Sequence, residues 1–343
     1  MRRTVLSALL SCALLLGLAG CAAQTPSPAP DCAPAEGDRL VVYTSHKEEV
    51  WQPIVKEFEE RTGIWVEVVA GGTNELLEQI QSQADSPRAD VMFGGGVESL
   101  TSYAGCFTPY RCAGAEEIAA QFQAPGDLWT PFSALPVVLI YNTKLLPEGA
   151  LTGWEDLLSP RYRGRIAFAD PSVSGSSFTA LVTLLCAVEG ENEEVIRLFA
   201  QNLGGRQLQG SGDVVASVAG GTDLVGITLE ETALKGLAAG YDIALVYPAD
   251  GTSCVPDASA LIKGAPHEDN ARLFLDFTVS AEVQRLLAGA FFRRSVREDV
   301  PAAEAMPPLA GLPAAAYDVA WASGHRESVL MTWAFYLGGE EEV

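Results

Sequence analysis

The sequence predicts an α/β protein with two α/β lobes that are joined by two crossover strands and separated by a ligand cleft. Three patterns predict this fold. Apolar strands alternate with amphipathic helices at the start of the body, a long apolar segment leads into a second series, and the last third returns to a strand, a turn and a helix. A body of about 300 residues also exceeds the usual size of one hydrophobic core, so two domains are expected.

The first lobe begins with three predicted strands, at residues 39–44, 64–70 and 89–95. Between the first two, a helix ends at Gly63, and its apolar residues fall on one face at helical spacing. Strands that alternate with such helices form a parallel sheet, which binds ligands at the carboxyl ends of its strands. Those ends are rich in small and polar residues, among them Ser45, His46, Gly95 and Gly96.

A long apolar strand at residues 136–146 is predicted to cross into the second lobe. The chain is predicted to return to the first lobe near residues 244–255, where a second composition break occurs. The predicted boundaries are therefore residues 38–134 and 257–343 for lobe 1, and residues 135–256 for lobe 2.

Small and hydroxylated residues, namely Ser174, Gly175, Ser176 and Ser177, lead into the apolar segment 178–188, and this pattern predicts a helix whose first turn is residues 176–178. One interpretation is that a serine caps the helix, because its hydroxyl oxygen accepts a hydrogen bond from a free amide of the first turn. The other is a site for phosphate, carboxylate or sulfonate, because the free amides and the helix dipole both favour an anion.

The N-terminus indicates export and anchoring. Two arginines precede an apolar segment too short to span a bilayer, and residues 18–21 (LAGC) resemble the lipobox of bacterial lipoproteins. We therefore expect residues 1–20 to be a signal peptide, Cys21 to be lipidated and the proline-rich residues 21–37 to be a tether. An ordinary secretory signal is the alternative. The expected location is extracytoplasmic, with a lipid anchor in a bacterial membrane.

The formal net charge is −22, and it becomes −24 once the two arginines of the signal peptide are removed. Such a charge argues against binding to nucleic acid and against a basic membrane-binding face. No cofactor is expected, and the protein is expected to be a monomer.

The cysteines predict one disulfide. Cys106 and Cys112 are separated by a turn-forming segment, and an exported protein meets an oxidising environment. The pairing of Cys32, Cys186 and Cys254 stays open. No metal site is expected, because no two cysteines have zinc-ligand spacing and the histidines are isolated.

Four segments carry a resemblance to a known family, namely VVYTSHKEEVWQPIVKEFEERTGIWVEVV, ADVMFGGGVESL, SGSSFTAL and VPDASALIKGAPHEDNARLFLDFTVSAEVQ. In this order and spacing, over about residues 40–335, the chain resembles the bacterial solute-binding lipoproteins of ABC importers, in the branch of the ferric-ion-binding proteins. The resemblance implies a type 2 periplasmic-binding-protein fold. Such a protein is not an enzyme; it closes around a solute and delivers it to a membrane permease.

The resemblance also implies a ligand set. In the ferric branch a histidine, a glutamate and two adjacent tyrosines hold the metal, and an anion lies on the serine loop. His46 falls at or beside the histidine position, Gly95 stands at the glutamate position, and Glu230 and Glu231 stand at the tyrosine positions. The resemblance therefore implies a dismantled metal site beside a retained anion site.

Two alternatives stay open for the remaining site residues. His46 is either a donor to the ligand or a surface residue at the start of a helix. Glu230 and Glu231 are either an acidic pair stabilised by the dipole of a helix that they begin, or receptors for an amine or a sugar hydroxyl.

The predicted function is capture of a small anionic organic solute for delivery to an ABC permease. The candidate solutes are a phosphonate, a sugar phosphate, a phosphorylated acid and a carboxylate. Ferric binding through a ligand set without tyrosine and an exported hydrolase are the alternatives. Against the hydrolase, no serine lies in a nucleophile-elbow motif and His46 has no evident triad context.

Overall fold

The computed structural model describes residues 34–304 and 306–338, and the residues from Glu36 onward form one compact unit. The predicted signal peptide at residues 1–20 and the predicted lipidation site Cys21 lie outside the described residues, as does most of the predicted tether.

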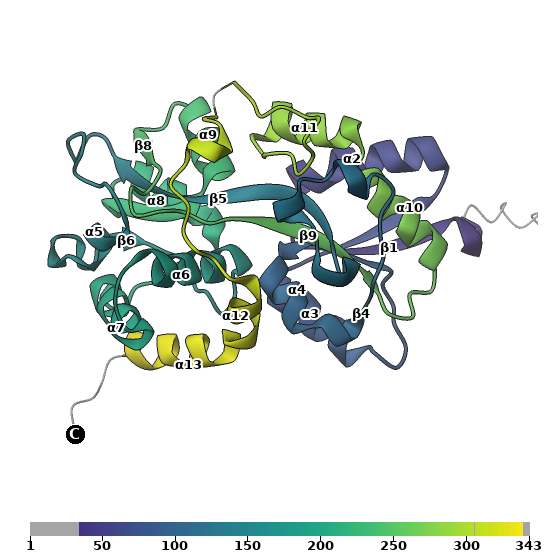
Figure 1. Cartoon of the computed structure of the whole chain (residues 1–343), viewed down its shortest axis with the longest axis horizontal. Helices are drawn as coiled ribbons and strands as arrows, with labels where there is room; N and C mark the ends of the chain where they lie inside the picture. The colour runs from purple at the N-terminus through teal and green to yellow at the C-terminus, as the bar shows by residue number, and fades with distance from the viewer. Residues whose placement is uncertain (1–33, 305, 339–343) are drawn as a thin grey trace, which may run out of the picture. The chain divides into compact units, whose positions relative to one another are not determined.

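The helices and strands follow the predicted alternation (Figure 1). The first series comprises β1 (Arg39–Thr44), α2 (Glu48–Thr62), β2 (Trp65–Ala70), α3 (Thr73–Ser82), β3 (Val91–Gly96), α4 (Val97–Ser102) and β4 (Phe107–Thr108). The second comprises β5 (Thr130–Asn142), α5 (Trp154–Leu158), β6 (Ile166–Ala167), α6 (Gly175–Ala187), α7 (Asn192–Leu203), α8 (Val214–Ala219), β7 (Val225–Leu229), α9 (Glu230–Ala238) and β8 (Ile243–Val246). The last comprises β9 (Cys254–Ile262), α10 (Glu268–Thr278), α11 (Ala281–Phe291), α12 (Val319–Gly324) and α13 (Arg326–Leu337).

Within the described residues the strands form one sheet in the order β2-β1-β3-β9-β5-β7-β6, with β4 paired to β9 and β8 paired to β5. The parallel pairing predicted for the first three strands is confirmed, because β1 runs parallel to both β2 and β3. Strands β6 and β7 are also parallel. At the centre the sheet is mixed, because β9 runs antiparallel to β3 and β5, and β5 runs antiparallel to β7. The reason is that β9 is the returning segment of the chain and enters the sheet from the opposite end.

Strand β5 belongs to both halves of the sheet (Figure 1). Its first part, Thr130 to Pro136, pairs with β9, and its second part, Val137 to Tyr141, pairs with β7. All of its residues are buried. A strand that changes partners along its length connects the two halves of the fold without a separate linker.

Each half has its own hydrophobic core. In the first half, Phe93 packs with Phe58 and Phe274 between the sheet and the helices α2 and α10. In the second half, Phe168 and Phe199 pack edge to face with ring centroids 5.2 Å apart. The burial of these aromatic side chains fixes the helices that carry the loops of the site.

The C-terminal helix α13 packs on the second half. Its Trp333 is buried, and its ring lies 5.5 Å from that of Phe168 and 5.7 Å from that of Phe199. The lobe boundaries stay a prediction; they place residues 257–343, and with them α13, in lobe 1. Trp333 finds its apolar partners beside α7 instead.

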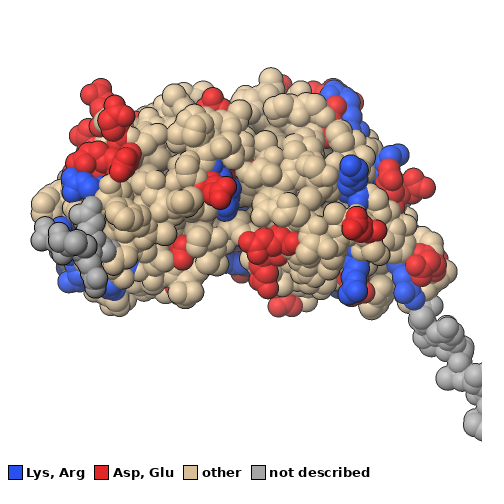
Figure 2. All heavy atoms as spheres, turned by 90° about the horizontal axis from the view of Figure 1, so that it is seen from below, with Lys and Arg blue, Asp and Glu red and all other residues tan. Residues whose placement is uncertain are grey.

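No helix among the described residues is long and apolar enough to cross a membrane. On the face shown in Figure 2, acidic and basic side chains lie in small mixed groups, and no broad basic area is visible on that face.

Candidate functional site

A cavity of about 320 Å³ lies where the predicted ligand-binding loops meet. Eight of the predicted site residues line it, namely Ser45, His46, Gly95, Gly96, Ser174, Gly175, Ser176 and Glu231. The two other predicted residues, Ser177 and Glu230, are buried but do not line this cavity. The volume is at the lower end of the range for small-molecule sites, which indicates a small solute.

The serine loop both caps α6 and lines the cavity. Ser174 is the N-cap residue, and its Oγ accepts a hydrogen bond from the backbone N–H of Ser177 at 3.3 Å. The hydroxyls of Ser174 and Ser176 lie 3.1 Å apart. Capping and lining are therefore compatible, because the cap uses one lone pair of Ser174 and leaves the hydroxyl of Ser176 beside the cavity.

Glycines let the loops approach one another at this point. Gly95 has a φ of +115°, and a side chain on it would come within 3.0 Å of the Thr73 methyl group. A side chain on Gly175 would come within 3.4 Å of the Thr73 hydroxyl. The first turns of α3 and α6 therefore face the same cavity from the two halves of the fold, and the position predicted for a glutamate ligand holds backbone only.

His46, Glu231, Asp257 and Arg293 line one side of the cavity, which we call the floor. His46 is buried there, so the surface alternative is excluded. Its ring packs against Phe93 and Phe132, with centroid distances of 4.6 and 4.8 Å. Its Nδ1 lies 3.6 Å from Oδ2 of Asp257. Burial lowers the pKa of His46 to about 4, which outweighs the opposing effect of Asp257, so the imidazole is neutral at pH 7.

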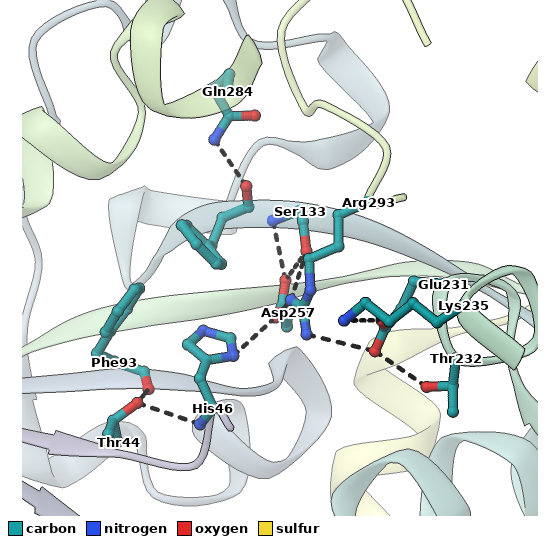
Figure 3. A network of polar contacts seen from close by, with 11 residues as sticks. Thr44, His46, Phe93, Ser133, Glu231, Thr232, Lys235, Asp257, Gln284 and Arg293 are labelled. Carbon is teal, nitrogen blue, oxygen red and sulfur yellow. Dashed lines mark hydrogen bonds and ion pairs between the residues drawn. The ribbon is translucent and has the colours of Figure 1, made fainter. Parts of the chain in front are cut away.

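Asp257 and Arg293 form the centre of the floor, and the sequence analysis missed both (Figure 3). The Arg293 guanidinium donates from Nη1 to Asp257 Oδ2 at 2.7 Å and to Ser133 Oγ at 2.9 Å. Ser133 in turn donates to Asp257 Oδ1 from its backbone N–H at 2.9 Å and from its hydroxyl at 2.7 Å. The buried carboxylate thus has a cation and two further donors.

Glu231 closes the other side of the floor. Its carboxylate lies 2.9 Å from the Lys235 ammonium and 3.8 Å from Arg293 Nη2, and it accepts a hydrogen bond from the Thr232 hydroxyl at 3.0 Å. Burial pushes the pKa of Glu231 upward, but Arg293 and Lys235 outweigh it and hold that pKa below its usual range. Glu231 is therefore ionised and already paired.

Glu230 takes part in a separate buried ion pair. Its two carboxylate oxygens accept hydrogen bonds from Arg294 at 2.7 and 2.8 Å, and the Tyr247 hydroxyl also donates to it. The two adjacent glutamates are thus paired with two adjacent arginines. The helix-start alternative is correct in position, since α9 begins at Glu230, but the buried guanidinium groups supply much closer counter-charges than the helix dipole.

One sequence signal could have revealed the missed arginines. Arg293 and Arg294 directly follow Phe291 and Phe292, at the end of an apolar helix. Charged residues in such a position are buried only when they are paired, and Glu230 with Glu231 is one of several acidic doublets in the chain that could supply the partners.

The floor does not offer a metal site. No group of three or more His, Cys, Asp or Glu side chains suited to a metal ion occurs among the described residues. The Arg293 guanidinium stands between the carboxylates of Asp257 and Glu231, and a positive charge there opposes a metal cation.

The predicted disulfide is not formed in the structure. Cys106 and Cys112 are free thiols, as are Cys186 and Cys254. The side chains of Cys106 and Cys112 pack in different hydrophobic clusters, so the short separation in sequence does not bring the two sulfur atoms together.

The fold and the cavity together define a two-part solute-binding protein. Residues 85–318 match the family described as bacterial extracellular solute-binding protein, and the chain belongs to that family. Its members are binding proteins and not enzymes, and they act outside the cytoplasm.

Similar proteins differ in what they bind. An uncharacterised protein of Haemophilus influenzae is 29% identical over 260 residues, which are 72% of this chain and 75% of that protein. Iron uptake protein A1 of Synechocystis is 26% identical over 301 residues, which are 83% of this chain and 82% of that protein. The periplasmic binding protein AfuA of Actinobacillus pleuropneumoniae, solved with exogenous fructose-6-phosphate bound, has a TM-score of 0.81 at 23% identity and covers 88% of this chain and 99% of its own. Because AfuA is only 23% identical, its similarity to this chain shows a shared fold and not a shared solute.

Proposed function

We propose that this protein captures a small anionic organic solute in the cavity and delivers it to the membrane permease of an ABC importer. The candidate solutes are a phosphonate, a sugar phosphate, a phosphorylated acid and a carboxylate. The observation that carries the proposal is the serine loop, which lines the cavity at the N-terminus of α6. As a member of its family, the protein is the solute-binding component of such a transporter.

The anionic end of the solute binds at the serine loop. Helix α6 is 13 residues long, and the cavity is lined by Gly175 and Ser176 of its first turn, where the positive end of the helix dipole lies. The hydroxyls of Ser174 and Ser176 and the first turn of α3 at Thr73 add further donors and polar surface. Such a set of neutral donors suits a phosphate, phosphonate or carboxylate group.

The other end of the solute is neutral. Asp257 and Glu231 are each paired with a buried or half-buried cation, so neither carboxylate is left to receive an ammonium group. The floor nevertheless presents both donors and acceptors, which suits hydroxyl groups. We therefore favour a hydroxylated anion over an amino-substituted one.

Ferric binding is the weaker candidate. Three relatives are named for iron uptake or Fe(3+) binding, but in this chain the floor is charge-balanced by Arg293. After ferric loading and gel filtration the protein should therefore retain no stoichiometric iron, and stoichiometric retained iron, coloured or not, would overturn the proposal.

A matched pair of serine variants tests the anion site. A panel of phosphate, phosphonate and carboxylate solutes is first titrated by calorimetry, and the tightest ligand is carried forward. Ser176→Ala removes a hydroxyl beside the cavity and should weaken binding by roughly tenfold to a hundredfold, since a hydrogen bond to a charged group contributes about 1.5–3 kcal/mol. Ser177→Ala alters the neighbouring buried serine, which does not line the cavity, and should change the affinity by less than about threefold. Equal effects of the two variants would refute the assignment.

Capture is expected to involve closure of the two predicted lobes around the solute. The predicted hinges lie near residues 132–137 and 246–256, and β5 changes its pairing partner near the first of them. Scattering curves that stay the same after saturation with the ligand would argue against closure.

The anchor is proposed to be a lipid on Cys21. Replacement of Cys21 by Ala should release the protein from the membrane fraction, because the remaining sequence carries no predicted anchor. Retention in the membrane fraction after this change would show that the lipobox interpretation is wrong.

A further inference from the structure

Glu98 lies directly behind the cavity, in the first turn of α4. Its side chain is completely buried. A side chain on the cavity-lining residue Gly96 would bring its first carbon within 3.0 Å of Glu98 Oε2. One layer of glycine backbone therefore separates a buried carboxyl group from the solute.

The hydrogen bonds of Glu98 come from two other parts of the chain. The hydroxyl of Thr179, on α6, is hydrogen-bonded to Glu98 Oε1, and the Tyr317 hydroxyl donates to the same oxygen at 3.2 Å. Glu98 Oε2 is buried without a hydrogen-bond partner. Thr179 itself lines the cavity, so the carboxyl holds a residue of the site across the boundary between the two halves.

The contacts fit a protonated carboxyl. A buried carboxylate needs a cation, and the nearby Arg326 donates to Asn74 at 2.8 Å instead of to Glu98. The Thr179 hydroxyl has one hydrogen and also lies 3.2 Å from the carbonyl oxygen of Gly175, which can only accept. If Glu98 is protonated, it donates to Thr179, and Thr179 donates to Gly175. Burial likewise raises the pKa of Glu98.

We propose that Glu98 is a positioning residue whose protonated carboxyl ties the first turns of α6 to α4, so that closing the cavity around a solute takes up a proton. This inference goes beyond the proposed function and rests on it only in that the solute enters this cavity. When α6 moves away from α4, the carboxyl loses Thr179, water reaches it, and it can ionise.

The sign of the coupling follows from the two states. The pKa of Glu98 is higher in the closed state than in an open, hydrated one, so closure is most favourable at low pH. The equilibrium constant for closure falls by up to about tenfold per pH unit as the pH rises from the open-state pKa to the closed-state pKa.

Other titratable groups face the Glu98 cluster. Tyr317 donates to the carboxyl and also interacts with Cys186 of α6, while Arg326 of α13 interacts with Tyr103 after α4 and with Glu78 of α3. The pKa of Tyr317 is raised well above its usual value by burial and by Glu98, and the pKa of Arg326 is lowered by burial. Glu98 is therefore the member of this cluster whose charge changes on closure.

Infrared spectroscopy of the solute-free protein tests the protonation directly. The wild-type protein should keep the C=O stretch of one protonated carboxylic acid at pH values where exposed carboxyl groups have ionised, and this band should be missing in Glu98→Gln. Glu67→Gln, which removes an exposed carboxyl on β2, is the matched control and should retain the band. A wild-type spectrum without the band overturns the proposal.

Scattering at a series of pH values tests the coupling. The radius of gyration of the wild-type protein and of Glu67→Gln should rise as the band titrates away, whereas Glu98→Gln should keep one value, since the amide stays neutral. Thr179→Val keeps the carboxyl but removes its link to α6, so the band should stay while its titration no longer changes the dimensions. An equal expansion in Glu98→Gln, or a titrating wild-type band without expansion, overturns the proposal. Neither measurement uses a solute, so failure here is distinct from failure of the proposed function.

Discussion

The two ends of the cavity are built in opposite ways. At the serine end, the hydroxyls of Ser174 and Ser176 and the first amides of α6 supply neutral donors. At the floor, Asp257 and Glu231 carry full charges, but each has a cation within ion-pair distance. The serine end therefore has donors for a negative charge that the solute can supply. The charges of the floor already cancel, so the floor needs no charge from the solute.

This difference teaches where specificity arises. A helix N-terminus accepts many anions, so the serine end selects for the sign of charge alone. The floor disfavours charged groups of the solute. A cation would have to compete with Arg293 for a buried carboxylate, and an anion would have to compete with the carboxylates for Arg293. The four predictions that follow disturb the floor or a surface contact beside it, from the largest expected effect to the smallest.

Removal of the floor cation should have the largest effect. Arg293→Met leaves the buried carboxylates of Asp257 and Glu231 without their shared guanidinium, and loss of one partner of a buried ion pair costs about 3–5 kcal/mol. Chemical denaturation measures this loss. Arg272→Met is the control, because the Arg272 side chain is 43% exposed and pairs with Glu268 along one helix. A loss below about 1 kcal/mol, as expected for the control, would show that Arg293 does not neutralise the floor.

His46 should make the free energy of unfolding depend on pH. Its pKa is about 4 in the folded protein, against an ordinary value of 6.5 for a solvated histidine, so below pH 6.5 the unfolded chain binds a proton that the folded protein does not. Stability should therefore rise with pH between about 4 and 6.5, by up to about 3 kcal/mol in total, and be unaffected by His46 above that range. His46→Gln should flatten this part of the profile. Identical profiles for the two proteins would argue that His46 is not held neutral by burial.

A matched pair of ligands should distinguish the neutral floor from an amine receptor. 2-Hydroxyethylphosphonate and 2-aminoethylphosphonate differ only in the group that would face Asp257 and Glu231. The hydroxyl compound should bind about tenfold more tightly, because the ammonium group loses its hydration without finding an unpaired carboxylate. Calorimetry at one pH and salt concentration measures the ratio. Tighter binding of the amine would show that a carboxylate of the floor is available.

A surface contact between the two halves should have the smallest effect. Lys235 also pairs with Glu49 of α2 at 2.8 Å, and the Glu49 side chain is 54% exposed. Glu49→Gln should lower the free energy of unfolding by less than about 1 kcal/mol, because exposed ion pairs contribute little. A loss comparable to that of Arg293→Met would mean that the surface contact, and not the floor, holds the two halves together.

The local elements were predictable from the sequence because short-range patterns determine them. The strand predicted at residues 39–44 is β1 without a shift, since a continuous apolar segment there meets polar residues at both ends. The helix predicted from residue 176 onward begins one residue earlier, at Gly175, because Ser174 caps it. The loops that line the cavity were predictable for the same reason.

The floor and the strand directions were not predictable in this way. Asp257 and Arg293 are 36 residues apart, and no local pattern links the isolated Asp257 to the arginine doublet at 293–294, so only the tertiary fold shows which charges pair. The antiparallel direction of β9 depends on how the chain returns from the second half, which no local pattern records. Glu98 looks like an ordinary acidic residue in the first turn of a helix, and its burial arises from Thr179 and Tyr317, which lie 81 and 219 residues away.

The central claim is that the cavity holds an anion at the serine end and no cation at the floor. Mass spectrometry of the solute released when the protein purified from its own cells is gently denatured tests this claim most directly. The account predicts a stoichiometric small molecule with a phosphate, phosphonate or carboxylate group and with hydroxyl groups in place of an ammonium group. A metal ion, or an organic cation without an acidic group, would contradict it.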